Sequence, residues 1–113
     1  MSTRATIKIK EGNCEQYIYH HHDGQPSGVG VELKNFLNGL KPYQWDIELI
    51  VNRLLKGWMS MNGRIDNEYE WTTCQRGDEE YAYLIDCGEK TIKCYKVGWD
   101  EFNWKEEKVV EIP

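Results

Sequence analysis

The sequence lacks a long apolar run, an excess of basic charge and a closely spaced pair of cysteines. No apolar stretch approaches the ~18 residues that a membrane-spanning helix requires, and the N-terminus runs directly into a strand pattern rather than a signal peptide. We therefore predict a cytoplasmic protein that does not associate with a membrane. The net charge of -5 argues against direct binding to nucleic acid, which would favour a basic face.

The cysteines are spread over the chain and form no CxxC pair. Without an export signal, we expect all four to be reduced thiols in or near the core. Their spacing gives no support to a zinc site. The sequence therefore indicates no disulfide framework and no cofactor. The four residues are Cys14, Cys74, Cys87 and Cys94.

A length of 113 residues fits a single domain over 1–113, because two cores of half that size would be too small to hold together. The apolar fraction of 40% supplies one core, to which five Trp and seven Tyr bring bulk and polar groups that need partners. Four of the five excess negative charges lie in residues 51–113. That half either presents an acidic face to a basic partner or carries ordinary solvated strand and turn positions.

The first half of the chain predicts a hairpin followed by two helices. Apolar and polar residues alternate over Arg4–Lys10, Gly12-Asn13 supplies a turn, and Glu15–His20 resumes as a strand. Ser27 is the expected N-cap of a short helix over about 29–38, which Gly39 ends. Pro42 fits the first turn of a longer helix over about 43–61. That helix has a broad apolar stripe formed by Ile47, Ile50, Val51, Leu54, Leu55, Trp58 and Met59.

The second half predicts an antiparallel meander. Its strands are expected at 68–74, 80–86 and 90–97, with a short edge strand near 108–112. The order ββααβββ predicts an α+β fold, with a single mixed or antiparallel sheet and two helices packed on one face. An aromatic segment before the last strand packs either on the sheet or in the interface of a homo-oligomer. Its aromatic residues are Trp99, Phe102 and Trp104.

The most distinctive local feature is the loop 20–30, which contains three histidines and four glycine or proline residues, Gly30 included. Strand alternation places His21 on the face of Tyr17 and Tyr19, and places His20 and His22 on the face of Ile18. The three imidazoles are therefore not expected to form one metal cluster. A hydrolase alternative acting on a phosphoester would either be metal-assisted, through His20, His22 and Asp23 as a 2-His-1-carboxylate set, or be built on the pair His21 and Asp23.

The same loop also suits the binding of a small anion. Glycines let the backbone approach a ligand, and the helix that follows would direct amide groups and its positive dipole end towards the loop. The sequence is neither a Walker motif nor a dinucleotide fingerprint. A purely structural interpretation, in which Asp23-Gly24 turns the chain and Pro26 stiffens it, stays open. The predicted ligand-binding residues are His21, Asp23, Gly24, Gly28, Val29 and Gly30.

These N-terminal residues resemble a group of small uncharacterised proteins from bacteriophages and their bacterial hosts, over about the first 30 positions. The resemblance implies a phage or prophage origin and action in the host-cell cytoplasm, and it favours a non-enzymatic binding protein. Such a protein would inhibit or sequester a host defence component or a nucleotide-like ligand, so the expected partner is a host protein or a small anionic ligand. The matching residues are Met1, Ser2, Thr3, Arg4, Thr6, Ile7, Ile9, Tyr19, His21, Asp23, Gly24, Pro26, Gly28, Val29 and Gly30.

Overall fold

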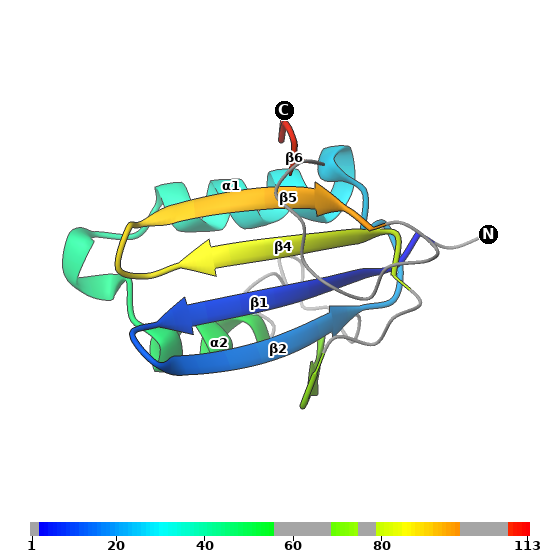
Figure 1. The fold of residues 1–113 in the computed structure, drawn as a ribbon. Coiled ribbons are helices and arrows are strands. Elements are labelled where there is room, and N and C mark those ends of the chain that lie inside the picture. The colour runs from blue at the N-terminus through cyan, green and yellow to red at the C-terminus, as the bar shows by residue number, and fades with distance from the viewer. Residues whose placement is uncertain (1–2, 56–68, 75–78, 98–108) are drawn as a thin grey trace, which may run out of the picture.

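The computed structural model describes residues 3–55, 69–74, 79–97 and 109–113. These residues form a six-stranded mixed sheet with helices α1 and α2 packed on one face (Figure 1), which confirms the predicted α+β fold. The strands are β1 (Ala5–Glu11), β2 (Cys14–His20), β3 (Tyr69–Thr72), β4 (Tyr81–Asp86), β5 (Thr91–Lys96) and β6 (Val109–Val110). The helices are α1 (Val31–Asn38) and α2 (Ile47–Leu55).

The predicted N-terminal hairpin is confirmed. Strands β1 and β2 are antiparallel, with Ile7 opposite Ile18, and both side chains are fully buried. Gly12 turns the chain between them at a φ of 59°, a left-handed conformation that glycine adopts without steric cost. Both strands of the hairpin thus contribute side chains to the core-facing side of the sheet.

The predicted meander is wrong at its first connection. Strand β3 pairs with β2 at one side of the sheet, whereas β4 lies parallel to β1 on the other side. Strand β1 is central because its side chains are buried on both faces, with Thr6 and Ile7 both fully buried, and a central strand needs a partner on each edge. The strand order is therefore β3-β2-β1-β4-β5-β6.

The later strands follow the prediction. Strands β4 and β5 form a hairpin whose turn is held by Asp86, because its carboxylate accepts the backbone N–H of Gly88 at 3.0 Å and of Glu89 at 3.1 Å. Strand β6 then pairs with the outer edge of β5, with Val110 opposite Cys94. The predicted short edge strand is thus confirmed. The aromatic residues Trp99, Phe102 and Trp104 lie outside the described residues.

The first helix starts later than predicted, and Ser27 is not its N-cap. Residues Pro26–Gly30 form a single π-helical turn, and α1 follows it directly at Val31. The backbone replaces a side-chain cap here, because the N–H of Val29 donates to the carbonyl of Asp23 at 2.7 Å. Gly39 ends α1 as predicted.

The second helix also starts later than predicted. Residues Pro42–Gln44 form a separate 3-10 turn, and α2 begins at Ile47. Two carboxylates determine this start: Asp46 accepts the N–H of Leu49 at 3.0 Å, and Glu11 accepts that of Ile47 at 3.2 Å. The predicted continuation to residue 61 lies outside the described residues. Within the described part of the chain, no helix is long and apolar enough to cross a membrane.

The core lies between the sheet and the two helices. Strand residues alternate towards it, and α1 and α2 each contribute apolar residues three or four positions apart. Cys87 and Cys94 are buried here as predicted, whereas Cys14 and Cys74 are exposed because they lie in or beyond strand ends. The fully buried aliphatic residues of the core are Ala5, Ile7, Ile9, Ile18, Val29, Leu33, Ile50, Leu54 and Ile85.

Candidate functional site

His20 and His21 lie on opposite faces of the sheet, as strand alternation predicted, whereas His22 lies beyond the end of β2, where the alternation that grouped it with His20 no longer applies. His20 is buried on the helix-covered face, where its ring lies 4.6 Å from that of Tyr69. His21 lies on the opposite face, edge-on to Tyr19 at 4.7 Å. His22 is exposed beyond the end of β2, and its ring centroid is 6.4 Å from that of His21. Tyr19, on the same face as His21, is buried beside Thr6 at the centre of that face.

His21 is paired with Glu70, a residue that no sequence pattern links to it. Its Nε2 lies 2.5 Å from Oε2 of Glu70 on β3, and 49 positions separate the two residues in sequence. The β2–β3 register brings them together, with Tyr19 directly opposite Glu70. Both side chains are partly exposed, so the pair contributes at most about 1 kcal/mol to stability. His21 and Glu70 thus form a side-chain contact across two neighbouring strands at the surface, and not within an enclosed pocket.

Asp23 bends the chain so that the loop closes on its own backbone. Its φ of 52° is left-handed, its side chain is exposed, and its carbonyl accepts the N–H of Val29. A Cβ added to Gly28 would lie 2.4 Å from that same carbonyl oxygen. Glycine is therefore required at position 28 by contact within the loop.

Gly24 is held between the first strand and the core. Its N–H donates to the carbonyl of Thr3 at 2.9 Å, and its carbonyl accepts the hydroxyl of Tyr83 at 2.7 Å. A Cβ here would lie 2.8 Å from the backbone of Arg4. Burial raises the pKa of the Tyr83 hydroxyl far above its usual range, so this group stays a neutral hydrogen-bond donor.

Gly30 completes the packing of the loop against the core. A Cβ at this position would lie 3.2 Å from the hydroxyl of Tyr83 and 3.3 Å from Ile112, and the neighbouring Val29 is fully buried. The N–H groups of Gly28 and Gly30 both donate to the carbonyl of Gln25. An anion site at a helix start needs free amides, and these amides donate within the chain instead. The ligand-binding role of the six selected residues stays a prediction.

The described residues do not gather a metal-ligand set. In residues 3–55, 69–74, 79–97 and 109–113, no three His, Cys, Asp or Glu side chains lie close enough to hold a metal ion. Burial raises the pKa of both Cys87 and Cys94 to about 11, so these thiols are protonated at neutral pH and are poor nucleophiles.

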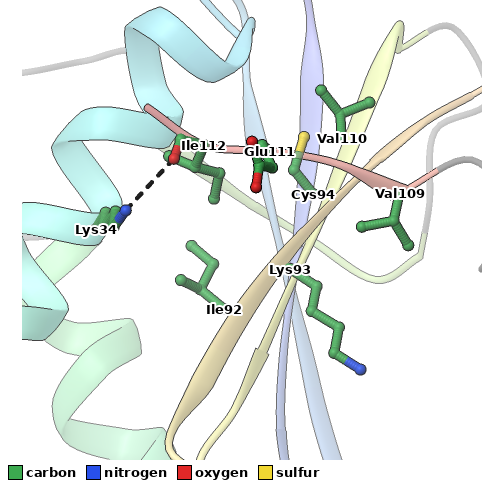
Figure 2. Close-up of a pocket in the computed structure, with 8 residues that line it drawn as sticks. All are labelled: Lys34, Ile92, Lys93, Cys94, Val109, Val110, Glu111 and Ile112. Carbon is green, nitrogen blue, oxygen red and sulfur yellow. Dashed lines mark hydrogen bonds between the residues drawn. The ribbon is translucent and has the colours of Figure 1, made fainter.

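A second candidate region lies at the β5 edge of the sheet. An open groove of about 300 Å³ runs between α1, β5 and the C-terminal segment 109–112 (Figure 2). Ile92 and Ile112 supply its apolar walls, and Nζ of Lys34 donates to the carbonyl of Ile112 at 3.4 Å. This groove was not predictable from the sequence, because its three walls come from distant segments and none carries a motif. Its lining residues are Lys34, Ile92, Lys93, Cys94, Val109, Val110, Glu111 and Ile112.

Comparisons with protein-family models, with curated proteins and with solved structures found no match to this chain. The function is therefore inferred from the two regions described above. One is the closed loop 23–30, and the other is the groove beside β5.

Proposed function

We propose that this protein is a non-enzymatic binding protein whose partner is another protein. The observation that carries the proposal is the open groove beside β5, which joins a sheet edge, apolar side chains and a lysine in one place. These are the features with which proteins recognise extended segments of other proteins. In the loop 23–30, by contrast, the amides of Gly28 and Gly30 donate to the carbonyl of Gln25, and that of Gly24 donates to the carbonyl of Thr3.

The N-terminal resemblance supports a phage or prophage setting for this activity. A small binding protein in the host-cell cytoplasm acts there by blocking or sequestering a host component. A host protein fits the groove better than a nucleotide-like ligand fits the loop, because the groove retains unused space and the loop is filled by its own backbone.

The test is a comparison of variants in partner capture followed by affinity measurement. Immobilised wild-type chain, Lys34→Glu and Lys41→Glu are exposed to bacterial lysate, and the recovered proteins are identified by mass spectrometry. Lys41→Glu is the matched control, since it makes the same charge change at an exposed position outside the groove. We expect one protein to bind wild type and Lys41→Glu equally, and Lys34→Glu at least tenfold more weakly in calorimetry with the purified partner.

Two results would overturn the proposal. One is turnover of a phosphoester that His21→Ala and Asp23→Ala abolish while the fold is retained, which would establish the hydrolase alternative. The other is a lysate that yields no protein partner, together with a rise in melting temperature on adding a mononucleotide, which would identify a small anionic ligand.

A further inference from the structure

We propose that the groove is a strand-addition site, in which an extended acidic segment of the partner pairs with the outer edge of β5 at Ile92. This inference rests on the proposed function and specifies how the partner is held. The added segment would place an apolar side chain between Ile92 and Ile112 and a carboxylate at Lys34.

The first supporting observation is that β6 covers only part of β5. Among the described residues, β6 pairs with Cys94 and Tyr95, whereas β5 extends back to Thr91. The outer edge over Thr91–Lys93 therefore lies beyond the end of β6. An uncovered strand edge presents backbone groups that another strand can pair with.

The backbone of Ile92 faces this open side. The N–H of Val97 donates to the carbonyl of Glu80, in line with the β4 register. Because backbone groups along an antiparallel strand point alternately to its two neighbours, Tyr95 and Lys93 face β4, while Cys94 and Ile92 face outward. Cys94 meets Val110 there. The N–H and C=O of Ile92 are thus directed at the space beyond β6.

The chain's own C-terminal segment leaves that space instead of filling it. Continuing the β5–β6 register would place Ile112 opposite Ile92. Ile112 lies instead against Gly30, and its carbonyl accepts the Lys34 ammonium. Figure 2 shows the segment crossing from β5 to α1, with Ile92 below it on the side of Lys34. This departure opens the groove.

The charges select an acidic partner strand rather than a second copy of the chain. Strand β5 carries Lys93 and Lys96, and Lys90 precedes it, so two copies pairing edge to edge would bring lysines together. Edge lysines oppose such self-association. Lys34 uses one of its three donors in a long contact with Ile112, and the remaining donors can hold a carboxylate.

The volume limits what the groove can hold. About 300 Å³ is at the lower end of the range for ligand pockets, which suits a few residues of an extended segment rather than a folded domain. Glu111 borders the groove near Cys94 (Figure 2), so we expect the acidic residue of the segment at the Lys34 end.

The probe is a display library of random nine-residue peptides, panned on the intact wild-type chain, on Lys34→Glu and on Lys41→Glu. We expect wild type and Lys41→Glu to enrich peptides with an Asp or Glu in a β-branched stretch. Lys34→Glu should enrich Lys or Arg at that place and bind the wild-type peptides at least tenfold more weakly. Circular dichroism confirms that each variant is folded. No enrichment, or enrichment without a charge preference that Lys34→Glu changes, would overturn the proposal.

Strand pairing is tested on one selected peptide by N-methylation of its amides in turn. Because Ile92 is the residue of Thr91–Lys93 whose backbone faces outward, methylation of the peptide amide that donates to its carbonyl should abolish binding, whereas methylation of the amides on either side should leave it unchanged. Hydrogen exchange of the Ile92 amide should slow in the complex. Equal tolerance at all positions would contradict strand addition. A lysate partner whose exchange footprint lies outside the groove would leave the protein-binding function standing and overturn this inference alone.

Discussion

The loop 23–30 and the groove beside β5 differ in two respects. The loop carries a recognisable sequence pattern and the groove does not, whereas the loop is filled by its own backbone and the groove has open space. The loop is rich in glycine and suggests a ligand cradle, but each of its glycines at 24, 28 and 30 meets backbone or core atoms at close range. The groove has no motif, but in the part of the chain that the structure describes it lies where β6 pairs with only part of β5. Glycines in a loop can therefore report tight packing, while a groove opens where strand pairing stops.

The largest change in stability is expected from Gly28→Ala, which tests whether the loop 23–30 is closely packed. Its Cβ would lie 2.4 Å from the carbonyl of Asp23, so the substitution should lower the free energy of unfolding by about 3 kcal/mol. Urea unfolding measures the change. Gly39→Ala is the control, since its Cβ has ordinary contacts and its backbone is right-handed helical, and it should be neutral or slightly stabilising. A Gly28→Ala variant of wild-type stability would show that the loop has room for a ligand.

A second prediction concerns the hydroxyl that supports the loop from the core. Tyr83→Phe leaves the buried carbonyl of Gly24 without its 2.7 Å partner, and should lower the free energy of unfolding by about 2 kcal/mol. Tyr43→Phe, at a side chain that is 77% exposed, should change nothing measurable. If both variants unfold at the same urea concentration, Tyr83 does not anchor the loop.

Alkaline pH should lower the free energy of unfolding, because the core contains the buried thiols of Cys87 and Cys94. The pKa of Cys87 and of Cys94 is raised to about 11 in the folded chain, above the value of 9.0 for an unburied thiol. The unfolded state therefore loses these protons first, so the stabilisation is complete below pH 9 and decreases as pH rises towards 11. We expect about 1 kcal/mol per thiol to be lost between pH 8 and pH 10. Urea unfolding at several pH values in this range measures the free energy of unfolding, which should fall less steeply with pH in Cys94→Ala than in wild type. An equally steep fall in the variant would contradict a raised pKa for Cys94.

The smallest change in stability is expected at the surface pair of His21 and Glu70, which lies outside the loop 23–30. His21→Ala and Glu70→Gln should each lower the free energy of unfolding by about 0.5 kcal/mol, because exposed ion pairs are weak. The double variant should lose less free energy of unfolding than the two single variants lose together, since the two side chains contact each other. A loss of several kcal/mol for either single variant would mean that the β2–β3 edge is a structural anchor comparable to the loop.

Much of the fold was predictable because the relevant signals are local. The alternation over 4–10 and 15–20 predicted the first hairpin, and the same alternation correctly separated His20 from His21. The start of α1 was mispredicted because its cap is a backbone group: the carbonyl of Asp23 replaces Ser27 at the turn before α1. The start of α2 was mispredicted because Pro42 begins a separate 3-10 turn, whereas α2 is capped by Asp46 and by Glu11, which reaches it from the end of β1.

The period of the side chains along the chain therefore specified the type of most elements and the face on which each strand residue lies. The neighbour of each strand was decided by packing around β1, because a strand buried on both faces needs a partner on each edge and local pattern does not say which. The pairing of His21 with Glu70 follows from that choice. So does the groove, since it exists only where the C-terminal segment turns from β5 towards Lys34.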